Sequence, residues 1–111
     1  MKRVLVTGAG GSAGINFINS LRLADEPYYI VGGDINKWHL ELPDIDKAYL
    51  LPNCTQSDYI EKLNKVIRLE NIEFIHPQPD VEVEVISANR NKINAKTLLP
   101  KHETIQICRS K

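Results

Sequence analysis

Residues 7–14 read Thr-Gly-Ala-Gly-Gly-Ser-Ala-Gly, and they join two segments with different hydrophobic periods. Before them, Val4–Thr7 lacks polar alternation, which indicates a strand buried on both faces. After them, a helix is predicted from about Ser12 to Ala24. Its inward face follows the spacing i, i+3, i+4 and i+7 and comprises Gly14, Phe17, Ile18 and Leu21. The pattern therefore predicts a strand that turns through glycines into a helix.

The rest of the chain repeats this alternation. Four more strands are predicted, at Tyr28–Val31, Ala48–Leu51, Glu73–His76 and Lys96–Leu99. Residues 36–46 are irregular and contain one short helical turn, and another turn is expected over Lys101–Cys108. A second helix is predicted after either a capping box of Thr55 and Asp58 or an N-cap at Ser57. Its inward residues are Ile60, Leu63, Val66 and Ile67.

The segment Val81–Val85 fits two structures. Its alternation of Val and Glu is a strand signal, whereas Asp80 after two prolines is a good N-cap for a helix. The helix is preferred because the strand–helix rhythm needs a crossover here. One helical face would then hold Val81, Val85, Ala88 and Asn89. Glu82 and Glu84 are interpreted as a solvated face.

Strands that alternate with helices predict a Rossmann-like α/β fold with three layers, α/β/α. The parallel sheet is expected to have about five strands in the order 3-2-1-4-5, and residues 1–111 to form a single domain. Because Lys plus Arg and Asp plus Glu number 14 each, no net field attracts nucleic acid or an anionic membrane. With no membrane-span pattern, signal peptide, metal-ligand spacing or CxxC, a cytoplasmic protein without a metal site is expected.

The glycine loop is the strongest candidate site. Gly8 permits a tight turn, Gly10 and Gly11 let backbone N–H groups approach an anion, and Gly14 lets the helix pack on the sheet. The helix N-terminus offers free N–H groups and a positive dipole end to a phosphate or carboxylate. The residues expected to bind this ligand are Gly8, Gly10, Gly11, Ser12, Ala13, Gly14, Asp34 and Asn36.

Asp34 ends the second strand about 20 residues after the last loop glycine, where an acidic residue can accept hydrogen bonds from ribose hydroxyls. A plainer interpretation stays open: Gly8 and Gly14 could serve only the turn, and Asp34 could be a surface cap. His76 is interpreted as structural. Trp38 and His39 are expected to pack at the sheet edge, with lining of a ligand cleft as the alternative. No catalytic residue is assigned.

Two known families share this loop. The spacing Thr-Gly-x-x-Gly-x-x-Gly of residues 7–14 is similar to the extended short-chain dehydrogenases, which bind NAD(P) and include sugar epimerases. Their catalysis also needs a Tyr followed four residues later by Lys. No tyrosine here meets that spacing, and the position after Tyr59 holds Leu63. This resemblance therefore implies an NAD(P)-binding fragment.

The rest of the chain looks more like the N-terminal, pre-ATP-grasp domain of ATP-grasp ligases, especially the carbamoyl phosphate synthetase-like group. Besides the glycine loop and Asp34, the matching segments are Asp46–Pro52, Phe74–Pro77 and Leu99–Lys111. In the last of these, Ser110 replaces the Asp that commonly precedes Lys in the family.

This second resemblance implies the substrate-side domain of an ATP-dependent carboxylate–amine or ammonia-type ligase, with no complete activity alone. The remaining ATP-grasp domains, in the same chain or a separate subunit, would hold ATP and Mg²⁺. The glycine loop would hold the phosphate or carboxylate of a small anionic substrate. The alternatives are an NAD(P)-binding fragment of an extended short-chain dehydrogenase or epimerase, and a non-catalytic nucleotide-binding or assembly subunit.

Overall fold

The computed structural model describes residues 1–97. Its strands and helices follow in the order β1 (Lys2–Thr7), α1 (Ser12–Arg22), β2 (Tyr28–Asp34), β3 (Lys47–Leu50), α2 (Tyr59–Glu70), β4 (Phe74–Pro77), α3 (Asp80–Ala88) and β5 (Lys96–Thr97). Two 3-10 turns, η1 (His39–Glu41) and η2 (Arg90–Lys92), lie in the connections. The last two residues of the predicted fifth strand and the helical turn predicted over Lys101–Cys108 lie outside the described residues.

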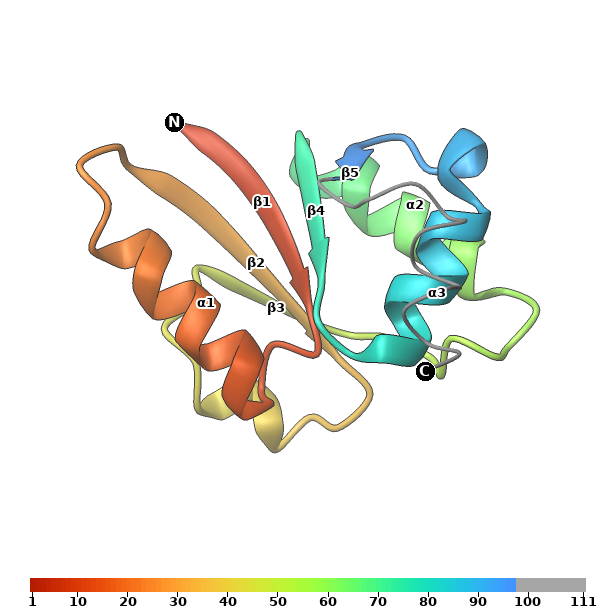
Figure 1. The fold of residues 1–111 in the computed structure, drawn as a ribbon, viewed down its shortest axis with the longest axis horizontal. Coiled ribbons are helices and arrows are strands. Elements are labelled where there is room, and N and C mark those ends of the chain that lie inside the picture. The colour runs from red at the N-terminus through yellow and green to blue at the C-terminus, as the bar shows by residue number, and fades with distance from the viewer. Residues whose placement is uncertain (98–111) are drawn as a thin grey trace, which may run out of the picture.

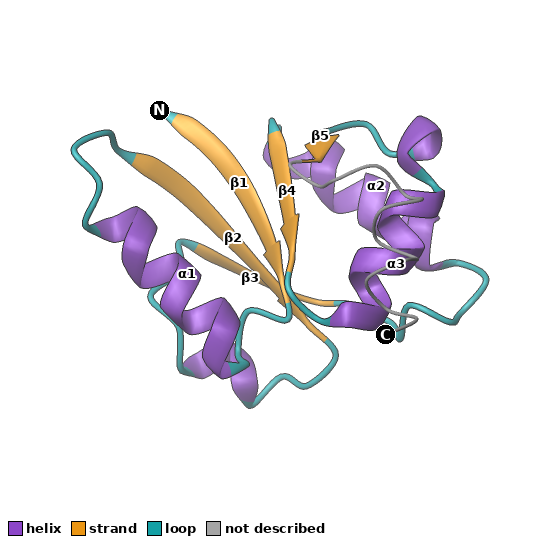
Figure 2. Ribbon diagram, viewed as in Figure 1, coloured by secondary structure: helices purple, strands orange, loops and turns teal. Residues whose placement is uncertain are grey.

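The five strands form one parallel sheet in the order β3-β2-β1-β4-β5, as predicted. Helix α1 covers one face of the sheet, and α2 and α3 cover the other (Figure 1). The three-layer α/β/α architecture is therefore confirmed. Because all strands run the same way, their carboxyl ends meet at one edge, from which the loops to the helices leave (Figure 2).

The core is divided between the two faces of the sheet. On the α1 side, Val4, Val6 and Ile30 pack against Ile18. On the other side, a larger cluster joins the sheet to α2 and α3; its sheet residues are Leu5, Val31 and Ile75, and its helical residues include Leu63, Ile67 and Ile86. The predicted inward faces of α1 and α2 are confirmed, because both helices place their apolar residues on these clusters.

The predicted starts of two helices are wrong in detail. Asp58 occupies the N-cap position of α2 without a side-chain cap hydrogen bond. Thr55 instead donates to Asn53 Oδ1 from its backbone N–H and its hydroxyl, at 3.1 and 3.0 Å. Asp80 is the first residue of α3 rather than its N-cap, which is Pro79. Before α2, the turn at Asn53 captures the Thr55 side chain that the capping prediction assigned to the helix.

The helical prediction for Val81–Val85 is confirmed, but its inward face is right only in part, because Val85 packs against the larger core cluster and Val81 and Ala88 do not. Glu82, Ile86 and Ser87 are buried, whereas Val81 is 46% exposed and Ala88 is exposed. The helix is rotated so that Glu82 and Ile86, four residues apart, face the sheet together. No helix of the described part of the chain is long and apolar enough to cross a membrane.

Candidate functional site

A cavity of about 570 Å³ opens at the carboxyl edge of the sheet. This is the edge at which open parallel sheets bind ligands. The segments that follow β1, β2, β3 and β4 all contribute to its walls. Its lining residues are Gly8, Gly11, Asp34, Ile35, Asn36, His39, Asn53, Cys54, Thr55, Pro79, Val81 and Glu82.

The glycine loop has the close backbone packing that its sequence predicts. Gly8 has a φ of +62°, a left-handed conformation that favours glycine, and a Cβ there would lie 2.6 Å from Pro79 Cδ. The Gly11 N–H donates to the Gly8 carbonyl at 3.1 Å, which closes the turn. Gly14 is buried against the backbone of residues 8 and 9. Gly8 and Gly14 therefore shape the loop, whereas Gly11 stays open to the cavity.

The N-terminus of α1 faces this cavity through Gly11. Gly11 is the N-cap residue, so no side chain caps the helix, and the first turn holds no acidic residue. The first N–H groups of a helix have no partner within it and carry the positive end of its dipole. This end of α1 therefore suits an anionic group such as a phosphate.

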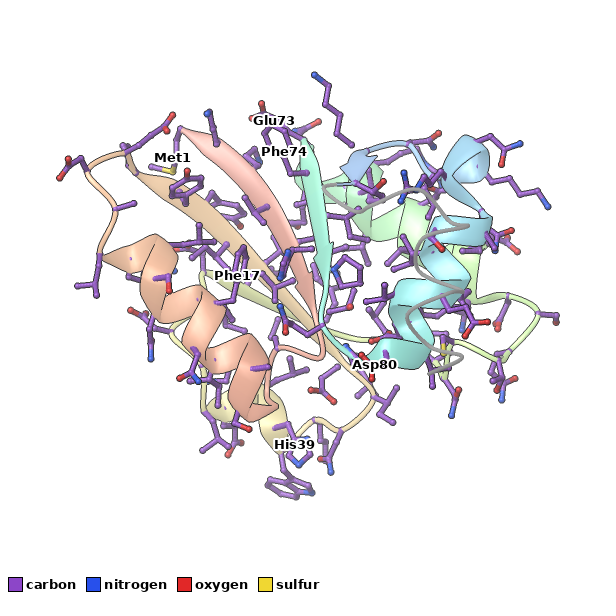
Figure 3. All side chains as sticks on the ribbon, in the orientation of Figure 1. Met1, Phe17, His39, Glu73, Phe74 and Asp80 are labelled. Atoms are coloured by element: carbon purple, nitrogen blue, oxygen red, sulfur yellow. The ribbon has the colours of Figure 1, made fainter. Side chains whose placement is uncertain are left out.

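Asp34 is the polar centre of the cavity. Its side chain is 8% exposed, and it accepts two backbone hydrogen bonds of 3.1 Å, from Gly10 N–H to Oδ2 and from Asn36 N–H to Oδ1. His39 Nδ1 lies 3.7 Å from Oδ1. Figure 3 shows His39 on one side of the carboxyl edge and Asp80 on the other. Because a carboxylate has about four acceptor positions, Asp34 keeps capacity for a ligand hydroxyl.

Glu82 is a second buried acid in the same wall. It is 8% exposed, and its Oε1 accepts a hydrogen bond from the Tyr59 hydroxyl at 2.8 Å. Burial raises the pKa of Glu82, and the charge of Asp34 adds to the rise, while the Tyr59 and Thr7 hydroxyls oppose it. The Thr7 hydroxyl is near enough to lower the pKa of Glu82, although Thr7 Oγ1 makes no hydrogen bond of ordinary geometry. The interpretation of Glu82 as part of a solvated face is therefore wrong.

The structure brings together part of the predicted site. Gly8, Gly11, Asp34 and Asn36 line the cavity, and Gly10 reaches it through its bond to Asp34. Ser12, Ala13 and Gly14 are not among the lining residues; the first two are exposed on the first turn of α1, and the third is buried.

The residues that sequence reasoning missed follow the third and fourth strands. They are Asn53, Cys54, Thr55, Pro79, Val81 and Glu82. Their only sequence signal is position, since each follows a strand that ends at the ligand-binding edge.

The structure places the three residues for which the sequence left a structural or a ligand-binding role open in different surroundings. His39 lines the cavity, so the alternative of a cleft-lining role fits it better than packing at the sheet edge. Trp38 is 64% exposed, with Lys37 Nζ 5.0 Å from its ring centroid, so the expected packing is wrong for it. His76 lies outside this cavity, and its ring stacks on Phe17 with 3.7 Å between centroids.

Comparison with protein-family models gives no match, and comparison with curated proteins gives no significant one. Several solved structures are similar. NAD⁺-bound xylitol dehydrogenase is 30% identical with a TM-score of 0.53, over 68% of this chain and 32% of that one. UDP-D-quinovosamine 4-dehydrogenase from Vibrio fischeri is 23% identical with a TM-score of 0.60, over 97% and 85% of the two chains. dTDP-glucose 4,6-dehydratase from Bacillus anthracis, in complex with NAD, is 18% identical with a TM-score of 0.56, over 87% and 37%.

These similarities overturn the resemblance to ATP-grasp ligases. The similar structures are dehydrogenases and a dehydratase, two of them described with bound NAD, rather than ligases. The expected ligase function, with ATP and Mg²⁺ held by further ATP-grasp domains, is therefore wrong. The chain spans about a third of the length of xylitol dehydrogenase.

Proposed function

We propose that this chain binds NAD(H) at the carboxyl edge of its sheet, as the cofactor-binding part of a dehydrogenase or epimerase. The observation that carries the proposal is a single cavity whose lining joins the glycine loop, the uncapped N-terminus of α1 and the buried carboxylate of Asp34. The NAD-bound state of two similar structures supports the choice of ligand.

The residues of the cavity fit the adenosine half of NAD. Phosphate oxygens would accept from the first N–H groups of α1, next to Gly11, where a side chain is lacking. The ribose hydroxyls would donate to Asp34, which two backbone N–H groups already hold in place. A 2′-phosphate would meet this buried carboxylate, and like charges at close range repel. The site therefore favours NAD(H) over NADP(H).

The lining residues bind and orient a cofactor. NAD supplies a hydride acceptor when bound, and the groups of this chain that face the cavity supply hydrogen-bond acceptors, N–H donors and apolar walls. None of Tyr28, Tyr29, Tyr49 and Tyr59 has a Lys four residues later. The function proposed for this chain is therefore cofactor binding rather than hydride transfer on its own.

Calorimetric titration with NADH and NADPH tests this proposal. NADH is expected to bind, and NADPH at least tenfold more weakly. Asp34→Ala should weaken NADH by roughly 1.5–3 kcal/mol, the value of a hydrogen bond to a charged group.

Asp25→Ala is the matched control, because Asp25 is exposed in the connection between α1 and β2, away from the cavity. Circular dichroism would verify that each variant is folded. The proposal is rejected if wild type binds no NADH, or if the two aspartate variants bind it equally well.

A further inference from the structure

We infer that Glu82 couples cofactor binding to proton uptake, because the cavity holds the diphosphate of NAD(H) best when this carboxyl is neutral. Binding would then be tighter in mildly acidic solution and weaker in alkaline solution. This inference rests on the proposed binding of NAD(H), and it concerns how pH regulates the same site.

Glu82 lies beside the glycine loop. In the sheet β4 pairs with β1, so α3, which follows β4, begins next to the turn that leaves β1. Pro79, immediately before α3, packs on Gly8, where an added Cβ would lie 2.6 Å from Pro79 Cδ. The Thr7 hydroxyl, at the end of β1, is near enough to act on the pKa of Glu82. The carboxyl therefore shares one cavity with Gly11 and the N-terminus of α1.

The cavity is rich in acids and poor in cations. Among residues 1–97, its lining includes two carboxyl groups, Asp34 and Glu82, and no lysine or arginine. Its imidazole, His39, lies 3.7 Å from Asp34 Oδ1, so that aspartate would match any positive charge on the ring. Asp80 and Glu84 add two more acidic side chains to α3. A diphosphate is doubly negative and the end of α1 offers only about half a positive charge, so an ionised Glu82 would oppose the ligand.

The surroundings of Glu82 favour its neutral form. The side chain is 8% exposed, and burial raises its pKa, with the charge of Asp34 adding to the rise. The Tyr59 hydroxyl donates to Oε1 at 2.8 Å, which fixes the carboxyl without supplying a positive charge. Burial also raises the pKa of Tyr59 and of the Cys54 thiol, so neither group is charged near neutral pH. Glu82 is therefore the acid of this cavity that gives up its charge most readily.

A bound diphosphate would raise the pKa of Glu82 further, and this rise couples the two events. Like charges at close range disfavour ionisation. A cavity of about 570 Å³ is roughly 10 Å across, and unit charges that far apart in a protein change binding by roughly tenfold. The affinity is then highest below the pKa of Glu82 in the free protein, where the carboxyl is already neutral. It falls as pH rises and levels off above the pKa of Glu82 in the complex.

Calorimetric titration with NAD⁺, in buffers of different ionisation enthalpy from about pH 5 to 9, measures the proton uptake. Wild type should take up roughly half a proton per NAD⁺ at the pH of strongest linkage, the value that belongs to a roughly tenfold change in affinity. Its Kd should rise by roughly tenfold from the acidic to the alkaline plateau.

Three variants assign the proton. Glu82→Gln imitates the neutral carboxyl, and its amide oxygen can still accept from the Tyr59 hydroxyl, so it should bind NAD⁺ without proton uptake and with a constant Kd. His39→Gln removes the imidazole of the cavity, a group that commonly gains a proton between about pH 5 and 8, and it should keep the uptake. Glu61→Gln is the matched control, because Glu61 is exposed on α2 and does not line the cavity. Circular dichroism at both ends of the pH range would verify that each variant is folded.

The outcomes separate this inference from the proposed function. Binding of NAD⁺ by wild type without proton uptake would overturn the coupling and leave the NAD(H) site intact. Uptake that persists in Glu82→Gln, or in the double variant Glu82→Leu with Tyr59→Phe, would assign the proton to another group and also overturn it. If wild type binds neither NAD⁺ nor NADH, the proposed function fails and this inference fails with it.

Discussion

Gly14→Ala is expected to destabilise the fold through a contact with backbone that cannot move aside. A Cβ at this position would lie well inside van der Waals contact with the Gly8 carbonyl oxygen, 3.1 Å from Ala9 Cα and 3.2 Å from Ala9 C. These atoms belong to the turn between β1 and α1, so the helix must shift away from the sheet to accept the methyl group.

The size of the effect follows from two opposing contributions. Overpacking a close contact costs about 1–3 kcal/mol, and the upper end applies here because the atoms that must yield are main chain. Replacing Gly by Ala inside a helix stabilises the helix by about 0.5–1 kcal/mol. The free energy of unfolding should therefore fall by about 2 kcal/mol, which corresponds to a Tm about 8 °C lower.

Gly11→Ala is the matched control. The nearest atom to its added Cβ would be Gly8 O at 3.5 Å, an ordinary contact, so only the modest loss of a glycine N-cap remains, about 0.5 kcal/mol. Because Gly11 lines the cavity, its methyl group should weaken NADH more than it weakens the fold. Urea denaturation followed by circular dichroism, with NADH titration of both variants, measures the two effects. A Gly14→Ala protein as stable as Gly11→Ala would refute the reasoning.

Two further predictions concern carboxyl groups with shifted pKa values. Glu70 accepts hydrogen bonds from the Tyr49 and Tyr29 hydroxyls, at 2.6 and 2.9 Å, and the Tyr49 bond is the main cause that lowers its pKa. The lowered pKa of Glu70 stabilises the fold fully above the unfolded-state pKa of about 4.3. This stabilisation is lost as pH falls through the lower pKa of Glu70 in the folded state. Tyr49→Phe should therefore cost about 1 kcal/mol in urea denaturation at pH 7 and less at pH 3, and an equal cost at both would contradict it. For Glu82 the pH dependence of stability has the opposite sign. Burial raises its pKa, so wild type loses stability as pH rises from about 4.3 through the pKa of Glu82 in the folded state. Glu82→Gln should remove that loss, and an unchanged pH profile between pH 4 and 8 would contradict it.

The fold could be predicted because its signals are local and agree with one another. The buried run at Val4–Thr7 and the helical spacing from Gly14 to Leu21 each fix an element and its inward face. The alternation of such elements then leaves few ways to connect a parallel sheet. This rhythm also predicts the helix over the ambiguous segment Val81–Val85, because parallel β4 and β5 need a crossover between them.

The orientation of α3 could not be predicted because it depends on a partner distant in sequence. Periodicity assigns valines inward and glutamates outward, and Val81 and Val85 satisfy that rule on one face. In the structure the Tyr59 hydroxyl, on α2, supplies a hydrogen bond to Glu82 and makes burial of its carboxyl tolerable. Nothing near Glu82 in the sequence carries this information. Glu82 is also one of the residues that line the cavity.

The glycine loop could not distinguish ATP-grasp ligases from short-chain dehydrogenases, for a related physical reason. A strand that turns through glycines into a helix places free N–H groups at the carboxyl edge of any parallel sheet, and this favours an anion whatever molecule carries it. The loop therefore predicts a binding position and a charge but does not distinguish a ligase substrate from a dinucleotide. The similar solved structures, rather than the loop, overturn the ligase interpretation. The space beside the loop is lined by Asp34, Cys54 and Glu82, among others. These residues come from three separate segments of the chain, and only the folded sheet brings them to one edge.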